Sequence, residues 1–309
     1  MRAAVLRKYG EAPEYREFEE PHGGNGHVVV DVEAAGVNHL DLLKASGKHF
    51  SGPPPLPSVI GSDGIGRLPD GQRVFFDAVV APYGSMAERV LVPKDALCEV
   101  ADGVDSAVAA ALGNTGLAAW LALEWRAELA PGETVLVLGA TGAVGSAAVQ
   151  IARELGAGRV IAAALPDERL ERLGADDVIE FTDDEELTAR LTRVAPDGVD
   201  VIIDPLWGPP AVAAMSAGRR GARHIQIGHM VSPTITLPAH LVRAVEIDIM
   251  GFAIFYTPID VRRAAYMRLT EFAARGGLAV DLEVLPLAEI GPAWARQQSG
   301  AGTKLVIEP

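Results

Sequence analysis

Two patterns of hydrophobic and polar positions divide the chain, and the change between them falls near residue 113. Before that point, short β-like runs are separated by glycine and proline, at residues 3–6, 27–32, 73–76, 88–92 and 97–100. Such punctuation is typical of strands joined by tight turns. We therefore expect a partly open, β-rich domain in the first part of the chain.

Beyond residue 113, β-like runs alternate with helical segments. Residues 134–138 are a continuous run of Thr, Val and Leu, as expected for a strand that is buried on both faces. Further runs follow at residues 160–163, 178–179, 199–203 and 224–227. Because strands separated by helices form βαβ units, this part of the chain predicts an α/β fold with a doubly wound parallel sheet. The last run, at residues 304–307, predicts a strand that returns to the first domain.

A glycine-rich turn follows the first of these strands. Residues 139–145 read Gly-Ala-Thr-Gly-Ala-Val-Gly, and apolar residues then recur at helical spacing up to Leu155. Between a buried strand and a helix, such glycines let backbone N–H groups approach a pyrophosphate at the positive end of the helix dipole. The alternative is a turn that serves only the packing of the helix on the strand. The context favours a Rossmann dinucleotide site made by Gly139, Thr141, Gly142, Ala143, Val144 and Gly145.

The end of the next strand bears on which dinucleotide binds. An acidic residue at that place would hold the ribose hydroxyls of NAD. The strand ends instead at Ala164, and the first carboxylate, Asp167, comes after a proline. An uncharged strand end leaves room for a 2′-phosphate within reach of Arg169 or Arg172, so we expect NADP (NADPH) rather than NAD. Each arginine alone is equally compatible with a solvated helix face.

Composition and charge narrow the range of functions. Hydrophobic residues make up 49% of the 309 residues and charged residues 22%, the balance of a soluble globular protein. The net charge of −14 argues against nucleic acid and anionic membrane surfaces as partners, because both select a basic face. Cys98 is the single cysteine, so no intramolecular disulfide forms, and a cytoplasmic setting is the simplest expectation.

One uncharged stretch, residues 107–123, has the composition of a membrane segment. Gly113-Asn114-Thr115-Gly116 interrupts it in the middle. We therefore expect two helical pieces joined by a polar turn, and no membrane span.

Several short motifs occur in a fixed order along nearly the full length of the chain. They are Gly36-Val37-Asn38 with Asp41, Pro57 with Gly61-Ser62-Asp63-Gly64, Gly84-Ser85-Met86-Ala87-Glu88 before Val92-Pro93, the glycine-rich turn, Leu173-Gly174-Ala175-Asp176, Gly228 and Lys304-Leu305-Val306. With these motifs in this order, the chain resembles the quinone oxidoreductase (zeta-crystallin-like) branch of the medium-chain dehydrogenase/reductase superfamily.

The resemblance implies a partly open, GroES-like catalytic domain at residues 1–112 and 251–309, with the Rossmann domain inserted at residues 113–250. It also implies a homodimer, and hydride transfer from NADPH to a small electrophilic substrate, either a quinone or an α,β-unsaturated carbonyl compound. A non-catalytic NADPH-binding sensor or structural protein is the alternative from a different class. Two segments are shorter than is usual in the family, the one after Gly66 and the one from Leu170 to Gly174.

The resemblance assigns further residues to the site. Asn38 and Asp41 match positions near the nicotinamide, with a loop held by Asx-type capping as the alternative. Thr115, Gly228 and Lys304 match positions at the cofactor, and a helix N-cap is the other role considered for Thr115.

A proton donor is harder to assign. The family commonly has a tyrosine after Ser-Gly in this region, but Lys48 and His49 follow Ser46-Gly47 here. A tyrosine-based role therefore does not transfer, and His49 becomes the candidate donor. An exposed loop histidine without a catalytic role is the alternative.

Zinc is expected to be absent. Zinc-dependent relatives bind the metal through cysteine and histidine in the first domain. The corresponding segments here read Asn38-His39-Leu40-Asp41 and, in place of Gly-His-Glu, Gly61-Ser62-Asp63. One cysteine does not make a Cys-rich site, and His39 with Asp63 supplies too few donors. An alcohol dehydrogenase, the nearest alternative among enzymes, is therefore disfavoured.

Overall fold

The computed structural model describes residues 1–49 and 51–309, which fall into two units. Unit 1 contains Met1–Asn114 and Pro258–Pro309, and unit 2 contains Thr115–Thr257. The sequence predicts an inserted domain at residues 113–250, so its observed start lies two residues later and its observed end seven residues later. The strand predicted at residues 304–307 is present and belongs to unit 1, as expected.

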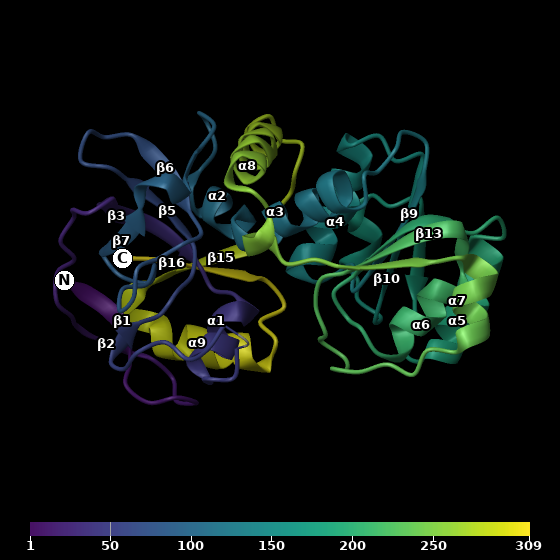
Figure 1. Cartoon of the computed structure of the whole chain (residues 1–309), viewed down its shortest axis with the longest axis horizontal. Coiled ribbons are helices and arrows are strands. Elements are labelled where there is room, and N and C mark those ends of the chain that lie inside the picture. The colour runs from purple at the N-terminus through teal and green to yellow at the C-terminus, as the bar shows by residue number, and fades with distance from the viewer. Residues whose placement is uncertain (50) are drawn as a thin grey trace. The chain divides into compact units, whose positions relative to one another are not determined.

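Unit 1 is built on strands from both ends of the sequence. One sheet has the order β15-β16-β3-β5-β6-β8, with β7 paired to β3, and a smaller sheet has the order β2-β1-β4. In Figure 1 the yellow β15 and β16 lie among the purple and blue strands of this unit. The strands are β1 (Arg2–Leu6), β2 (Glu14–Glu17), β3 (His27–Gly36), β4 (Ser58–Val59), β5 (Gly64–Arg67), β6 (Arg73–Phe76), β7 (Arg89–Pro93), β8 (Leu97–Glu99), β15 (Leu282–Pro286) and β16 (Lys304–Glu308).

The helices of unit 1 pack on these sheets. They are α1 (His39–Ala45), α2 (Ser106–Leu112), α8 (Ile259–Ala274) and α9 (Ile290–Ser299). α2 begins after Asp105, whose carboxylate accepts a hydrogen bond from the N–H of Ala107 at 2.8 Å and so satisfies one of the free donors of the first turn. The core of the unit joins distant segments, because Trp294 of α9 and Leu305 of β16 pack with Phe76 of β6.

Unit 2 contains the predicted parallel sheet. Its strand order is β11-β10-β9-β12-β13-β14, and each neighbouring pair runs parallel, so the doubly wound α/β prediction is confirmed. The strands are β9 (Thr134–Leu138), β10 (Arg159–Ala164), β11 (Asp177–Glu180), β12 (Val199–Asp204), β13 (Gly218–Gln226) and β14 (Asp248–Gly251). Strand order reverses between β9 and β12, which is where ligands bind in sheets of this kind.

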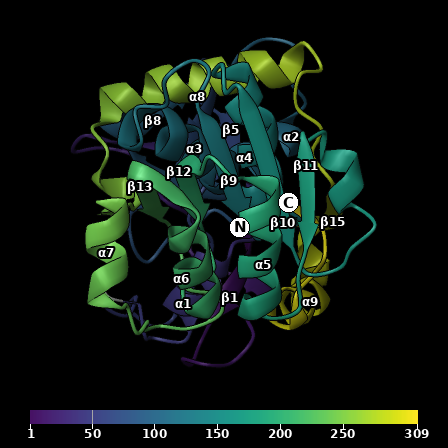
Figure 2. The same ribbon diagram turned by 90° about the vertical axis from the view of Figure 1, so that its right-hand side faces the viewer.

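Helices cover both faces of this sheet. They are α3 (Asn114–Leu121), α4 (Ala143–Glu154), α5 (Asp184–Val194), α6 (Pro209–Ser216) and α7 (Ala239–Val245). Figure 2 shows α5 and α6 in front of the strands and α4 behind them. Leu136 and Leu138 of β9 pack toward α5 and α6, in one apolar cluster with Leu187 and Ala211.

The uncharged stretch forms two helical pieces, as predicted. α2 ends at Leu112, α3 begins at Asn114, and a turn of π-helix (Ala122–Arg126) follows α3. Among the described residues no single helix is long and apolar enough to cross a membrane, and only this broken pair would do so by length and composition.

Candidate cofactor and substrate sites

The glycine-rich turn connects β9 to α4 at the switch point of the sheet. Gly139 adopts a positive φ of 59°, and the N–H of Gly142 donates to its carbonyl at 3.0 Å, which closes the turn. Gly142 is the N-cap of α4 and has no side chain to satisfy the first N–H groups of the helix. Those N–H groups have no carbonyl of a preceding helical turn to accept their hydrogen bonds, so the start of α4 is suited to binding an anion.

Close packing explains why the last glycine of the turn is required. A Cβ at Gly145 would lie 2.2 Å from the carbonyl oxygen of Gly139, far inside van der Waals contact. A Cβ at Gly142 would meet only that same oxygen, at 3.3 Å. Gly142 and Ala143 are also exposed, whereas Gly145 is buried. The turn therefore has one glycine that the fold needs and one whose open surface suits the approach of a ligand.

The end of β10 is uncharged, as the sequence predicts. Ala164 is the last residue of the strand and is buried. Asp167 lies three residues further on and pairs with Arg169, whose Nη2 is 2.6 Å from the Asp167 carboxylate. This hydrogen bond holds the pKa of Asp167 down at about 2. The guanidinium predicted to meet a 2′-phosphate is therefore already bound to a carboxylate.

Two other predicted cofactor residues of unit 2 have clear structural surroundings. Gly228 follows β13, and a Cβ there would lie 2.8 Å from the carbonyl oxygen of Pro205, so the residue packs against the turn after β12. Thr115 lies inside the first turn of α3, which begins at Asn114, so the N-cap role considered for Thr115 is wrong. A distant carboxylate bonds the first N–H of that helix instead, because the Oδ2 of Asp63 accepts from the N–H of Asn114 at 2.8 Å.

In unit 1, a buried polar cluster forms around Asn38, just after β3. The Asn38 side-chain N–H donates to Oδ1 of Asp63 at 2.6 Å, and its Oδ1 accepts from the ammonium of Lys304 at 2.5 Å. The same ammonium donates to the carbonyl of Val37 at 2.9 Å. Lys304 is therefore held inside unit 1 by Asn38 and Val37, which are the contacts that the structure gives its ammonium.

A second chain of hydrogen bonds starts at Asp41 in α1. One carboxylate oxygen of Asp41 accepts from the N–H of Asn38 at 2.9 Å, which is one half of a capping box. The other accepts from the hydroxyl of Ser62 at 2.6 Å. Ser62 in turn accepts from the ammonium of Lys44 at 3.0 Å. Asp41 thus caps the start of α1 through the backbone of Asn38.

Burial shifts the ionisation of this cluster. Burial raises the pKa of Asp63 to about 7, with the charge of Lys304 opposing the rise and that of Asp41 adding to it. Burial also raises the pKa of Asp41, against the hydrogen bonds from Ser62 and Asn38. Burial lowers the pKa of Lys304. Each shift has the direction expected when a charged form is removed from water.

His49 lies apart from this cluster, in the loop after α1. Its Nδ1 is 2.7 Å from the hydroxyl of Ser51. Burial lowers the pKa of His49 below its ordinary value of 6.5, and the charge of Lys44 adds to that effect. A lower pKa leaves less of the protonated ring at neutral pH, so these surroundings do not favour His49 as the proton donor.

A cavity of about 290 Å³ opens beside the second chain of hydrogen bonds. Asp41, Lys44 and Ser62 lie on one part of its wall, and apolar residues such as Leu6, Val59 and the proline run at residues 53–55 make much of the rest. Its size is close to the lower end, about 300 Å³, of cavities that hold small molecules. An apolar cavity with a few convergent polar groups is suited to a small substrate with one polar end.

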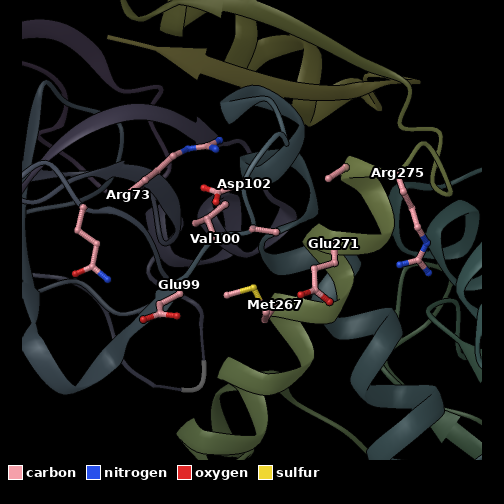
Figure 3. Close-up of a pocket in the computed structure, with 10 residues that line it drawn as sticks. Arg73, Glu99, Val100, Asp102, Met267, Glu271 and Arg275 are labelled. Carbon is pink, nitrogen blue, oxygen red and sulfur yellow. The ribbon is translucent and has the colours of Figure 1, made fainter.

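A larger hollow of about 750 Å³ lies elsewhere on unit 1. Figure 3 shows Met267 and Glu271 of α8 on one side of it, with Arg275 just after that helix, and Glu99 and Asp102 on the other. None of its wall residues belongs to the polar cluster around Asn38 or to the Asp41–Ser62–Lys44 chain. Although this hollow is the larger of the two, its wall lacks the buried polar residues described above, so we do not assign it as the candidate substrate site.

Comparison with known proteins identifies the family. A family model described as zinc-binding dehydrogenase matches residues 143–271. Quinone oxidoreductase-like protein 2 of Rattus norvegicus is 28% identical over 263 residues, which cover 81% of this chain and 74% of that protein. NAD-dependent alcohol dehydrogenase of Sulfolobus acidocaldarius is 31% identical over 245 residues, or 66% of this chain and 70% of that one. The quinone oxidoreductase of Thermus thermophilus, solved also in complex with NADPH, is 32% identical, with a TM-score of 0.82 and 100% of each chain covered.

The chain belongs to the quinone oxidoreductase branch of the medium-chain dehydrogenase/reductase superfamily. The family resemblance read from the sequence motifs is thereby confirmed. As a member of this branch, the protein is an oxidoreductase.

This medium-chain dehydrogenase/reductase does not fit zinc at the positions where zinc-dependent members bind it. Asn38 and Ser62 stand there in place of cysteine and histidine, and each accepts a hydrogen bond from a lysine ammonium. Two ammonium groups at these positions repel a divalent cation and occupy the oxygens that would bind it. Within the part of the chain that the structure describes, no group of three or more His, Cys, Asp or Glu residues is placed to hold a metal ion.

The sequence motifs missed part of the site of this medium-chain dehydrogenase/reductase. Lys44 follows Asp41 by three residues on one helix, a spacing that places two side chains on the same face, and this pair was available as a signal. Ser62 lies in the Gly61-Ser62-Asp63 motif, but a lone serine there gave no sign of its hydrogen bonds to Asp41 and Lys44. The contact of Asp63 with Asn114 needs the close approach at Gly113, where a Cβ would lie 2.5 Å from the carboxylate.

Proposed function

We propose that the protein is an NADPH-dependent reductase that transfers hydride to a quinone or an α,β-unsaturated carbonyl compound without a metal ion. The observation that carries the proposal is the open start of α4, placed at the switch point of a parallel sheet. Phosphate groups bind at such places because backbone N–H groups and the helix dipole both favour an anion.

The residues of unit 2 fit a dinucleotide. Gly142 and Ala143 expose the backbone to which a pyrophosphate would bind, and Ala164 adds no negative charge at the ribose side. NADPH is favoured over NADH because a carboxylate is missing from the end of β10 and because the Thermus thermophilus relative was solved with NADPH. The pairing of Arg169 with Asp167 is the feature that opposes this preference.

When bound, NADPH supplies the hydride, and the protein supplies binding and electrostatics. The glycine-rich turn holds the pyrophosphate through backbone N–H groups. The apolar wall of the 290 Å³ cavity excludes water from a small acceptor. Because Asn38 and Ser62 do not fit zinc, hydrogen-bond donors of the chain must stabilise the negative charge that develops on the acceptor.

Fluorescence titration of the purified protein with NADPH and with NADH is the first test, followed by addition of 1,4-benzoquinone and of 2-hexenal. We expect tighter binding of NADPH and its oxidation after an acceptor is added. Tight binding with no oxidation across a panel of quinones and enones would favour the non-catalytic NADPH-binding protein instead. Failure to bind either nucleotide would remove the basis for the cofactor site.

Independence from zinc is tested on the same material. We expect less than one equivalent of zinc by elemental analysis, and a rate of NADPH oxidation that is unchanged after dialysis against a chelator. Loss of activity on chelation, with recovery on adding zinc, would show that the metal-free part of the proposal is wrong.

A further inference from the structure

Lys44 gives the 290 Å³ cavity of unit 1 its positive charge. Of the wall residues that the structure describes, only Asp41 and Lys44 are charged. Both oxygens of the Asp41 carboxylate accept hydrogen bonds, from Asn38 and Ser62. An ammonium has three donors, and the contact that the structure gives Lys44 is the one with Ser62 at 3.0 Å. Lys44 therefore has donors left for a molecule in the cavity.

Ser58 supplies a second, independent sign of a ligand. It lies on the wall of the same cavity and is only 2% exposed. Among the described residues its hydroxyl has no hydrogen-bond partner. A buried hydroxyl without a partner is costly to the fold, so its presence is explained if a polar atom of a ligand satisfies it.

Neither Lys304 nor His49 supplies the positive charge of this cavity. The ammonium of Lys304 is buried and bound to Val37 and Asn38, and Lys304 is not part of the cavity wall. His49 is bound to Ser51 in the loop. Lys44 is thus the positively charged side chain that faces the cavity within the described chain.

We propose that Lys44 binds the carbonyl oxygen of the acceptor in this cavity and gives it a proton as the acceptor is reduced. The Lys44–Ser62–Asp41 hydrogen bonds fix the position of the ammonium, and the apolar wall holds the carbon skeleton. The proposal rests on the reductase function proposed above and names the residue that would polarise its substrate.

In the proposed step the acceptor gains two electrons and one hydrogen as hydride at carbon, and its carbon–carbon π electrons shift so that the carbonyl oxygen becomes an enolate. An N–H bond of the Lys44 ammonium breaks and an O–H bond forms at that oxygen, which gives an enol. The enol of an unsaturated carbonyl compound then tautomerises to the saturated compound, and that of a quinone becomes the hydroquinone as its CH2 carbon loses a proton to water and its second carbonyl oxygen gains one. A hydronium ion of the solvent returns the proton to the Lys44 amine, and the hydride donor leaves oxidised. Placing a cation where negative charge develops is the usual way in which enzymes stabilise such oxygens.

The test uses 4-nitrophenol, a one-ring compound whose phenolate absorbs visible light and mimics the charged oxygen. Binding to the protein without nucleotide should lower the pKa of the bound phenol, seen as more phenolate absorbance at a fixed pH. Lys44→Met should lose this shift, Lys44→Arg should keep most of it, and Lys94→Met, which removes an exposed lysine of the same unit, should behave as the wild type. A retained thermal midpoint in Lys44→Met shows that the variant is folded.

Kinetics give a second measurement. Removing one donor from a developing oxyanion costs about 100-fold in rate, so Lys44→Met should lower kcat/KM for 1,4-benzoquinone by about that factor while the Kd for NADPH is unchanged. Ser58→Ala should weaken 4-nitrophenol binding without lowering the thermal midpoint, because the lost hydroxyl has no partner in the described structure.

The outcomes separate this inference from the proposed function. A wild type that oxidises no NADPH but shows the Lys44-dependent phenolate shift would reject the reductase function and keep the anion site. A wild type that reduces acceptors, with Lys44→Met as active as Lys94→Met, would reject the role of Lys44 alone. Absence of any 4-nitrophenol binding to the wild type, or an equal shift in Lys44→Met, would also reject it.

Discussion

Lys304 donates a hydrogen bond to Oδ1 of Asn38, although 266 positions separate the two residues in the sequence. Lys304 begins β16, and Asn38 lies just beyond the end of β3, to which β16 is paired. Burial lowers the pKa of this ammonium, and the charges of Asp63 and Asp41 oppose that effect. One buried charge therefore joins β16 to the polar cluster around Asn38.

Lys304→Met is expected to destabilise unit 1. The substitution removes the ammonium that donates to the oxygens of Asn38 and Val37, and a buried acceptor left without its donor costs about 1 to 3 kcal/mol. Urea unfolding followed by fluorescence measures the change in the free energy of unfolding. Lys8→Met is the control, because Lys8 is 73% exposed and pairs with Glu11 at the surface. Equal unfolding midpoints for the two variants would contradict the role given to Lys304.

Stability should fall as the pH rises from about 4 to about 7, because the pKa of Asp63 is about 7 in the folded chain and 3.8 is its ordinary value. Between these values the folded chain keeps a proton that the unfolded chain has lost. One such group contributes at most about 1.4 kcal/mol per pH unit to this slope.

Asp63→Asn removes that titration. Its free energy of unfolding should therefore change less than that of the wild type between pH 5 and pH 7.5, measured by urea unfolding at both values. A residual slope of the same sign is expected from Asp41, whose pKa burial also raises. Parallel curves for wild type and variant would show that Asp63 is already ionised across this range.

Two glycines of the turn after β9 should respond differently to alanine. Gly145→Ala forces a Cβ to within 2.2 Å of the Gly139 carbonyl oxygen, so we expect a loss of about 2 kcal/mol or more in stability. Gly142→Ala places a Cβ 3.3 Å from the same oxygen, a tight contact that a small shift relieves, so we expect a thermal midpoint much closer to that of the wild type and weaker NADPH binding. Calorimetry and fluorescence titration of both variants check the pair. Unchanged NADPH affinity in Gly142→Ala would argue against a phosphate at this turn.

The Asp167–Arg169 pair should govern the choice between NADPH and NADH. Asp167→Asn weakens the contact with the Arg169 guanidinium and removes a negative charge, so the ratio of NADH to NADPH dissociation constants should rise. Arg169→Ala leaves Asp167 alone, and that ratio should fall. Arg193→Ala is the control, because Arg193 is exposed on α5 and is not one of the arginines considered for the 2′-phosphate. If Arg169→Ala and Arg193→Ala changed the ratio equally, the pair would have no special role.

We propose that the chain forms a homodimer through β14, the edge strand of the parallel sheet. Ile249 on this strand is 41% exposed, and unpaired edges bind other strands readily. Ile249→Lys should shift the mass measured by light scattering from dimer to monomer. Val284→Lys, on the edge strand β15 of unit 1 and 40% exposed, should leave the dimer intact. Dissociation by the second variant alone would place the interface on unit 1.

Local patterns in the sequence were sufficient for much of unit 2. The run at residues 134–138 is β9 without a residue of difference, because strands buried on both faces have no polar positions to obscure them. The expected strand at residues 224–227 is the end of the longer β13, which begins at Gly218. Arg219 and Arg220 hid its first half, since exposed charged residues at a strand start carry no hydrophobic signal.

The contacts of the candidate cofactor and substrate sites were harder to predict from the sequence. The pairing of Asp167 with Arg169 depends on how a short loop folds, and the loop could be read either as a solvated face or as a phosphate site. The contacts of Asn38 with Asp63 and Lys304 join three segments that are far apart in the sequence. Such contacts depend on strand pairing, which no local spacing of residues records.

The position of β16 between β15 and β3 has a consequence for the order in which the protein is made. Unit 2 is contiguous in the sequence and can fold as soon as residues 115–257 have left the ribosome, because domains generally fold as units during synthesis. Unit 1 must wait for residues 304–308, and until then the end of β3 at Ala35 and Gly36 lacks the strand that pairs with it. The half of the protein that is translated first is thus the half that is finished last.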